Sequence, residues 1–292
     1  MKILLFSRRR LPHAAEELAA LRDALLRAGF DYAVNEEFAD LLAERIGWHL
    51  PPEQRYGAFV GAQPADAVLV CYGGDGTLLE GVRRLGGLRR PVLGINAGHL
   101  GFLTVAPNEG LDELFAALAD GSLRFEERTL LHVAGDFVER PDVPLALNEF
   151  SLLRSGTGML SVEAFVDDRL VATYHGDGVI LATPTGSTAY ALSAGGPVVA
   201  PSCACFVLAP LAPHNLTMRP VVVPDTSRLR LKIVGDRTEA FATLDNRSYG
   251  VGPEASFELA KAADPIFLAV PHNRSFYDTL RNKMMWGMDL RG

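Results

Sequence analysis

The pentapeptide Gly73-Gly74-Asp75-Gly76-Thr77 joins a predicted strand to a predicted helix. The apolar residues 67–72 before it have the length and β-branched content of a buried strand. Leucine and valine recur at helical spacing over residues 78–85 after it. Glycines let backbone amides approach a ligand closely, and the start of a helix adds unpaired N–H groups that favour an anion such as phosphate. The sequence therefore predicts a phosphate-binding turn after a strand.

Asp75 is the unexpected residue in this turn, because a carboxylate repels phosphate. A carboxylate beside a phosphate site can accept the proton of an attacking hydroxyl, or it can help to hold a metal ion. A tight turn in which an aspartate caps the helix is the alternative that involves no ligand. Asp75 is thus a candidate either for chemistry or for helix capping.

The first third of the chain alternates between predicted strands and helices. Helices are expected around residues 18–25 and 38–46, and Gly29 suits the C-cap of the first. Strands are expected at residues 2–6, 32–34, 67–72 and 91–95. This alternation predicts a parallel sheet covered by helices. Such sheets bind ligands at the carboxyl ends of their strands, where Asp75 and the loop at 96–102 are expected.

The pattern changes after a helix predicted at 111–119, which Asn108 is expected to cap and Gly121 to end. A final helix is expected at 275–285 and should return to the first domain. Several short strands predict a mostly antiparallel second domain. These strands are residues 130–133, 145–153, 161–166, 170–174, 179–182, 221–223, 229–234 and 241–244, with a hairpin turn at Asp167-Asp168.

The fold class is therefore α/β plus mostly-β, with a parallel-sheet N-terminal domain and a β-rich C-terminal domain. The predicted first domain is residues 1–105, completed by 268–292. The predicted second domain is residues 106–267.

Composition limits the class of protein. Of the 292 residues, 48% are hydrophobic and 22% are charged, which is typical of a globular protein. The formal net charge of −7 argues against a general nucleic-acid or membrane-surface binder. Three cysteines without CxxC spacing argue against a disulfide framework or a zinc site. No apolar run fits a signal peptide or a membrane span, so a cytoplasmic protein is expected.

Three polar clusters lie in the predicted second domain. Asn148-Glu149 interrupts an apolar run, where both side chains need partners unless a strand simply ends there. His175-Gly176-Asp177-Gly178 is a glycine-flanked acid, for which a turn is the simpler interpretation. Hydroxyls and backbone amides that suit the ribose, amide and phosphate groups of a nucleotide gather in the third cluster. This cluster is Thr183-Pro184-Thr185-Gly186-Ser187-Thr188-Ala189-Tyr190, followed by Ser193 and Gly195-Gly196.

Several well-known motifs are absent from the sequence. It has neither the G-x-x-x-x-G-K-[ST] loop nor a G-x-G-x-x-G after a strand. The G-x-S-x-G elbow and H-E-x-x-H are also missing. Phosphate handling must therefore come from the glycine-rich turns and a metal ion.

The combination of motifs resembles the NAD kinase family. The resemblance extends from residue 66 to the C-terminal helix. Its first motif is shared with diacylglycerol-kinase-like and phosphofructokinase families, whereas the combination with residues 183–190 is specific. The matching stretches are residues 73–77, 93–96, 100–103, 148–149, 176–197, 213–216 and 219–220.

The resemblance implies transfer of the γ-phosphoryl group of ATP to the 2′-hydroxyl of the adenosine ribose of NAD, giving NADP. It also implies Mg²⁺ on the ATP phosphates, which needs few protein ligands, and a homodimer or homotetramer. By motif position Asp75 is the catalytic base. The family contacts the dinucleotide at positions matching Gly76, Asn148, Glu149, Asp177, Thr188, Ala189, Tyr190 and Ser193. The predicted site further includes Gly73, Gly74, Thr77, His175, Ser187 and Arg247.

Two of these residues depart from the family pattern, and two other functions stay open. His175 stands where many members carry Arg, and Arg247 replaces a commoner polar amide. A kinase for a lipid or sugar hydroxyl shares the first glycine motif, but the acidic net charge and the polar segment 183–190 argue against a lipid. A non-catalytic dinucleotide sensor would keep the binding residues, and the presence of Asp75 argues against it.

Overall fold

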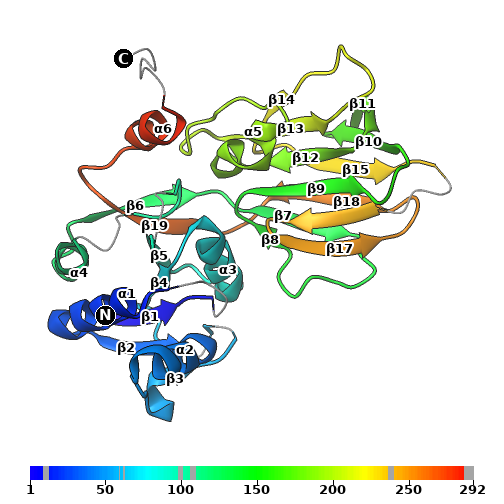
Figure 1. The fold of residues 1–292 in the computed structure, drawn as a ribbon. Coiled ribbons are helices and arrows are strands. Elements are labelled where there is room, and N and C mark those ends of the chain that lie inside the picture. The colour runs from blue at the N-terminus through cyan, green and yellow to red at the C-terminus, as the bar shows by residue number, and fades with distance from the viewer. Residues whose placement is uncertain are drawn as a thin grey trace. The chain divides into compact units, whose positions relative to one another are not determined.

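The computed structural model describes residues 1–8, 13–58, 60–61, 63–97, 101–105, 110–235 and 240–285 (Figure 1). Its contacts divide the chain into two compact units. The first unit is Met1–Glu127 with Ile266–Gly292, and the second is Arg128–Pro265. Each unit has a buried hydrophobic core of its own.

A seven-stranded sheet forms the centre of the first unit (Figure 1). The pairings from β3 across to β19 are parallel, which confirms the predicted parallel-sheet domain. In sheet order the strands are β3 (Arg55–Tyr56), β2 (Asp31–Asn35), β1 (Lys2–Phe6), β4 (Val68–Tyr72), β5 (Pro91–Ile95), β19 (Ile266–Pro271) and β6 (Leu123–Arg128).

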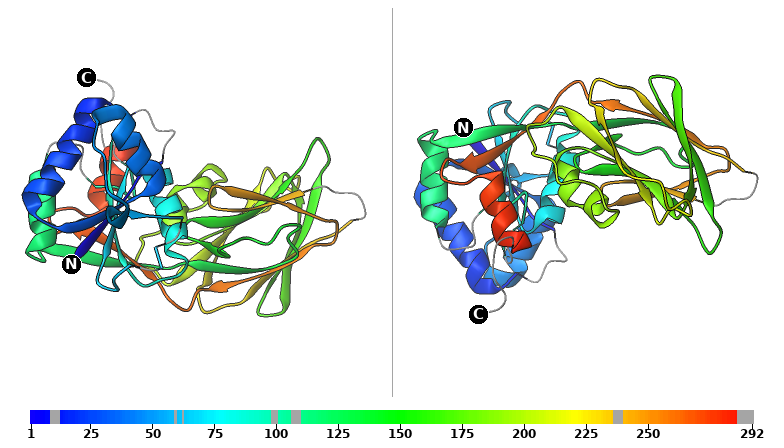
Figure 2. Two further views of the ribbon diagram at one scale, coloured as in Figure 1. Left: turned by 90° about the horizontal axis from the view of Figure 1, so that it is seen from below. Right: turned by 90° about the horizontal axis from the view of Figure 1, so that it is seen from above.

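Helices cover both faces of this sheet. One face packs on α1 (Ala15–Ala28), α2 (Glu36–Ile46) and α4 (Leu111–Ala119), and Figure 2 shows α1 and α4 side by side. The other face packs on α3 (Asp75–Leu85), where a Cβ on Gly81 would overlap the sulfur of Cys71. β4 contributes side chains to both faces of the sheet, because successive side chains of a strand point to opposite faces.

The C-terminal segment completes the first unit. β19 lies between β5 and β6 in the sheet, and α6 (Phe276–Met284) follows it. Ser275 caps this helix by accepting the N–H of Asp278 at 3.1 Å. The prediction that the chain end returns to the first domain is therefore confirmed.

The two units divide later in the chain than the sequence predicted. α4 packs on α1 and β6 joins the sheet beside β19, so residues 111–127 belong to the first unit rather than the second. The short, polar strand β6 carries no sign of which sheet it joins. Asn108, the predicted cap of α4, lies outside the described residues, and Gly110 occupies the N-cap position.

Two six-stranded sheets with antiparallel pairings enclose the core of the second unit. One has the order β11 (Arg169–Gly176), β10 (Leu160–Val166), β15 (Leu229–Ile233), β18 (Ser256–Lys261), β7 (Leu131–Gly135) and β8 (Leu145–Ala146). The other has the order β14 (Val221–Pro224), β13 (Cys205–Leu211), β12 (Gly178–Ala182), β9 (Glu149–Arg154), β16 (Ala240–Leu244) and β17 (Arg247–Val251).

Short segments connect these strands. After β12 the chain forms a 3-10 turn, Thr185–Thr188, and the one-turn helix α5 (Tyr190–Ser193). The predicted hairpin turn between β10 and β11 is confirmed, since Asp167 and Asp168 have φ values of 48° and 62°. A second 3-10 turn, Pro52–Gln54, precedes β3 in the first unit.

The run at residues 145–153 forms two strands, so the single strand expected there is wrong. β8 ends at Ala146 in one sheet, and β9 begins at Glu149 in the other. The backbone amides of residues 147–149 donate to the side chain of Asp245 rather than to a neighbouring strand. Asn148 and Glu149 therefore lie where the chain crosses from one sheet to the other.

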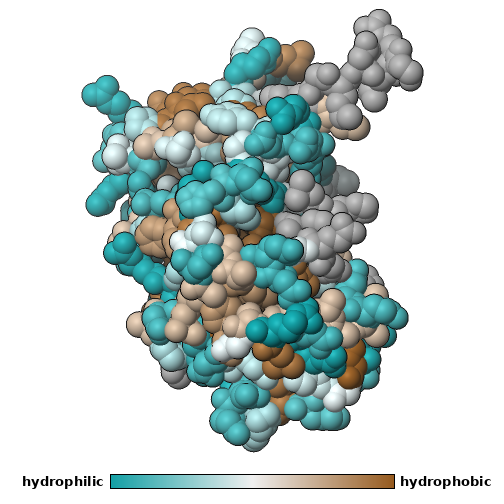
Figure 3. All heavy atoms as spheres, turned by 90° about the vertical axis from the view of Figure 1, so that its left-hand side faces the viewer, coloured by the Kyte–Doolittle hydropathy of each residue, from teal (hydrophilic) through white to brown (hydrophobic). Residues whose placement is uncertain are grey.

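The surface shows no sorting into apolar and polar halves on the side drawn in Figure 3. Hydrophobic patches there are interrupted by hydrophilic side chains. Within the described ranges, no helix is long and apolar enough to cross a membrane.

Candidate active site

The glycine turn has the geometry that its sequence predicts. Gly73 has a φ of 150°, which favours glycine, and its N–H donates to the carbonyl of Ile95 at 2.8 Å. Gly74 is the N-cap of α3 and Asp75 is the first helical residue. The first amides of a helix have no partners within it, so they are free to meet an anion. Thr77 is buried in the first turn of this helix.

Asp75 does not cap its own helix, so the capping interpretation is wrong. Its carboxylate accepts the backbone N–H groups of Phe102 and Leu103 at 2.8 and 3.1 Å. It also accepts the hydroxyl of Thr104 at 3.2 Å. A side chain at Gly101 would overlap the carboxylate. Residues 101–105 therefore hold Asp75 in one orientation.

Two arginines that no motif singled out lie near this turn. Arg274, which follows β19, donates to the carbonyls of Thr104 and Gly101 at 2.8 and 3.3 Å. Burial lowers the pKa of its guanidinium, and the charge of Asp75 opposes that change. Arg8, which follows β1, has a guanidinium nitrogen 3.5 Å from the place that a Cβ on Gly76 would take. Both add positive charge at the start of α3.

Glu149 lies buried at the start of β9 in the second unit. Glu149 is only 7% exposed, and its Oε2 has no hydrogen-bond partner among the residues that the structure describes. Burial, followed by the negative charge of Asp245, raises the pKa of Glu149 to about 8, whereas the backbone of Tyr190 opposes this shift. A buried polar atom without a partner is costly. Together with the shifted pKa, it marks Glu149 as a candidate ligand contact.

The segment 183–190 packs against Asn148. Thr183 donates its hydroxyl to the carbonyl of Leu147 at 2.6 Å and its backbone N–H to the carbonyl of Asn148 at 2.8 Å. Any side chain at Gly186 would overlap the backbone of Asn148. The structure thus brings together two polar clusters that lie far apart in the sequence.

The partly exposed end of this segment adjoins two acids. Burial raises the pKa of Tyr190, and the negative charges of Asp177 and Glu149 raise it further. These three side chains are therefore close enough to interact. Asp177 also accepts Nε of Arg154 at 2.6 Å. Three predicted contacts remain accessible beside them, namely Thr188, Ala189 and Ser193.

Ser187, another residue of the predicted site, has hydrogen-bond partners within its own segment. It is fully buried, and its hydroxyl donates to the carbonyl of Pro184 at 2.7 Å. The hydroxyl also accepts the N–H of Val199 at 2.9 Å. Its polar atoms thus serve the fold of this segment.

Arg247 and His175, the two departures from the family pattern, have partners within the protein. Arg247 donates to the carbonyls of Val143 and Leu145 at 2.7 and 2.5 Å. His175 is exposed near the end of β11, and its Nδ1 is 2.8 Å from the hydroxyl of Ser161.

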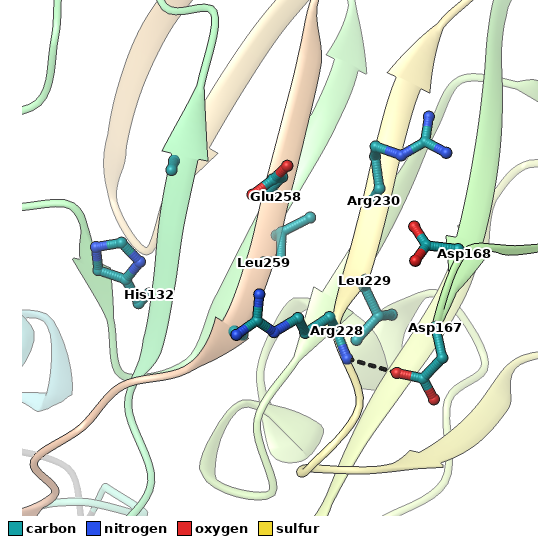
Figure 4. Close-up of a pocket in the computed structure, with 10 residues that line it drawn as sticks. His132, Asp167, Asp168, Arg228, Leu229, Arg230, Glu258 and Leu259 are labelled. Atoms are coloured by element: carbon teal, nitrogen blue, oxygen red, sulfur yellow. Dashed lines mark hydrogen bonds between the residues drawn. The ribbon is translucent and has the colours of Figure 1, made fainter.

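A separate hollow of about 600 Å³ lies on the face of one sheet of the second unit (Figure 4). His132 reaches it from β7, Glu258 from β18 and Arg230 from β15. The backbone N–H of Arg228 donates to Asp167 at its edge, at 3.0 Å. Both acidic and basic side chains line this hollow, and none of the predicted site residues is among them.

Comparisons with known proteins identify the family. The profile of the ATP-NAD kinase N-terminal domain matches residues 14–123, and that of the C-terminal domain matches residues 147–261. An NAD kinase from Porphyromonas gingivalis is 36% identical over 303 residues, which cover 99% of both chains. The chain belongs to the NAD kinase family. NAD kinases are phosphotransferases, so this chain phosphorylates NAD to NADP with ATP.

Other NAD kinases extend this likeness over the whole chain. The NAD kinase of Flavobacterium psychrophilum is 32% identical over 294 residues and covers 100% of both chains. The structure of an Archaeoglobus fulgidus NAD kinase in complex with ATP has a TM-score of 0.71 and 27% identity, covering 98% of this chain and 99% of that one. The structure of yeast NADH kinase complexed with NADH has a TM-score of 0.86 and 22% identity, covering 100% of this chain and 89% of that one. At this identity the likeness shows a shared fold and no more.

Proposed function

We propose that Asp75 is the base in the transfer of the γ-phosphoryl group of ATP to the 2′-hydroxyl of the adenosine ribose of NAD. The new bond joins the 2′-oxygen to the γ-phosphorus, and the bond from that phosphorus to the oxygen retained by ADP breaks. The proton of the hydroxyl passes to the Asp75 carboxylate. One observation supports this assignment above all. The Asp75 carboxylate is held by hydrogen bonds from residues 102–104, which lie outside the helix that Asp75 begins.

The hydrogen bonds of Asp75 suit this task. Oδ1 accepts two of the three bonds, from Leu103 and Thr104, whereas Oδ2 accepts one, from Phe102. Each carboxylate oxygen can accept two, so Oδ2 can meet a ribose hydroxyl. A carboxylate is a weak base, but phosphoryl transfer has a loose transition state in most analyses, so alignment matters more than full deprotonation.

The ATP phosphates are assigned to the start of α3. Its first amides and the guanidinium of Arg8 supply positive charge there. The oxygens of Asp75 are ligands of the kind that Mg²⁺ takes, and the ion needs few of them when phosphates also bind it. A divalent ion bound with ATP would neutralise phosphate charge.

NAD is assigned to the polar cluster of the second unit. Support comes from Glu149, whose Oε2 is buried and has no hydrogen-bond partner in the described part of the chain, and from the contact between Asn148 and residues 183–186. Asp177, Thr188, Ala189, Tyr190 and Ser193 complete this assignment. A homodimer or homotetramer and a cytoplasmic location stay predictions of the sequence.

Replacement of Asp75 tests the base. Asp75→Asn should lower kcat about 10²-fold or more, because an amide cannot take the proton, and should leave the Kd for NAD nearly unchanged. Thr104→Val is the matched control, since it removes one of the three bonds and keeps the carboxylate. The assay is NADP formation from NAD, ATP and Mg²⁺. Near-normal kcat in Asp75→Asn, or an equal loss of kcat in Thr104→Val, would contradict the role of base. Asp75 would then only hold residues 102–104 in place.

A further inference from the structure

The hairpin turn between β16 and β17 reaches the break before β9. Asp245, which has a φ of 52°, accepts the backbone N–H groups of Leu147, Asn148 and Glu149 at 3.0, 2.7 and 3.2 Å. Its own N–H donates to the carbonyl of Glu149 at 2.9 Å. One side chain thus binds three successive amides in the segment that bears both NAD residues.

Arg247, on the same hairpin, binds the residues just before this break. Its guanidinium donates to the carbonyls of Val143 and Leu145 at 2.7 and 2.5 Å. It also lies 3.6 Å from the carboxylate of Asp142. The hairpin therefore holds residues 143–149 through two side chains. The guanidinium of Arg247 binds backbone carbonyls in this segment, and the carboxylate of Asp245 binds backbone amides.

A plain strand could not be held in this way. Successive amides of a strand point in opposite directions, so three in a row cannot reach one carboxylate unless the chain turns. The turn also has a cost, because burial raises the pKa of Asp245 even though the three amides and Arg247 favour its charged form. A costly contact that fixes a bend beside a ligand-binding pair indicates a role in positioning.

We propose that Asp245 and Arg247 are positioning residues that hold Asn148 and Glu149 in the orientation that recognises NAD. The inference rests on the NAD role proposed above for Asn148 and Glu149. The negative charge of Asp245 also opposes ionisation of Glu149. Asp245 thus holds Glu149 in place and adds to the effect of burial on its pKa, and Arg247 acts without touching NAD.

Kinetics of Asp245→Asn provide the first test. This change keeps the shape of the side chain and removes its charge and one acceptor. The Kd for NAD should rise about tenfold or more, because two ligand-binding side chains lose their orientation. The kcat at saturating NAD and the KM for ATP should change far less. Arg247→Met should act in the same direction, and Arg247→Lys should recover part of the affinity.

The pH dependence of NAD binding provides a second readout. Glu149 should titrate near pH 8 in the wild type, so the Kd for NAD should change around that pH. Without the charge at position 245 the midpoint should move to lower pH, and in Glu149→Gln the transition should vanish. Tyr190, which interacts with Glu149, and Asp177, which interacts with Tyr190, are the same in all these proteins. Calorimetric titration from roughly pH 6 to 9.5 spans the transition.

Asp167→Asn is the matched control. Asp167 also occupies a hairpin turn with a positive φ, 48°, and accepts a backbone N–H, that of Arg228, at 3.0 Å. It binds no predicted NAD residue, so its loss should lower the melting temperature and leave the Kd for NAD unchanged.

The outcomes separate the two proposals. An Asp245→Asn variant that melts earlier, like Asp167→Asn, and yet binds NAD with the wild-type Kd and pH midpoint would overturn the positioning role. If Asp245→Asn does not fold, the Kd values of Arg247→Met and Arg247→Lys for NAD test the positioning role instead. Wild-type Kd values in both variants would overturn it. Wild-type NAD affinity in Asn148→Ala and Glu149→Gln would overturn the NAD role itself, and the positioning role with it.

Discussion

Glu149 shows what a single residue's surroundings add to its sequence. The polar pair Asn148-Glu149 within an apolar run predicted that both side chains need partners. The raised pKa could not be predicted, because the acid that contributes to it, Asp245, lies 96 residues further along the chain. Near neutral pH the Glu149 carboxyl thus carries a proton and can donate a hydrogen bond to a ligand as well as accept one.

The raised pKa of Glu149 should lower the stability of the ligand-free protein as pH rises. Below the ordinary value of 4.5, both folded and unfolded states are protonated, and the residue has no effect. Between pH 4.5 and about 8 the unfolded state is ionised while the folded state keeps the proton, so the free energy of unfolding falls as pH rises and levels off above about 8. The decline should be on the order of 3–5 kcal/mol.

Glu149→Gln isolates this effect, because the amide does not titrate. Urea unfolding of both proteins at several values between roughly pH 5 and 9 should show a stability difference that increasingly favours the variant up to about pH 8 and is constant above it. Parallel stability curves would mean that Glu149 ionises in the folded protein as it does in the unfolded chain.

At the scale of the element, the strand–turn–helix at residues 67–85 was predictable because its apolar spacing and glycines are local. The loop beside it was expected at the same sheet edge, but its hydrogen bonds to Asp75 depend on long-range packing. Several strands were not predicted at all. β17, with the sequence Arg-Ser-Tyr-Gly-Val, is too polar to be read as a strand, and it forms through its pairing with β16.

Arg274 should matter for turnover through this loop. Arg274→Ala removes the donors to the carbonyls of Gly101 and Thr104, so the loop that holds Asp75 should loosen. We expect kcat to fall about tenfold, as for loss of one or two good hydrogen bonds, with little change in the KM for NAD. Arg281→Ala, which removes a surface ion pair with Asp278, is the control from the same segment. Equal kinetics in the two variants would contradict this role.

At the scale of the whole molecule, the two fold classes were predictable from the change in hydrophobic pattern near residue 120. The border between the units was not, because α4 and β6 carry no local sign of the sheet that they join. Strand partners across long stretches of chain decide such cases.

The separate cores predict separate effects of core mutations. Phe38 is fully buried in the core of the first unit, and Phe257 in that of the second. Replacing either with Ala should cost about 3–5 kcal/mol through lost contacts and an unfilled cavity. Limited proteolysis with mass spectrometry should find the new cleavage sites in the mutated half alone. Cleavage spread over both halves in each variant would show a single cooperative unit.

The position of β19 also has a consequence for biosynthesis. A ribosome releases the chain from its N-terminus, so β5 and β6 emerge long before the strand that lies between them. Until Ile266–Pro271 appears, β6 has no neighbour and β5 has an open edge, which is prone to pairing with other chains. Arg128–Pro265, by contrast, is one continuous stretch. The half that is synthesised first is therefore the half that finishes folding last.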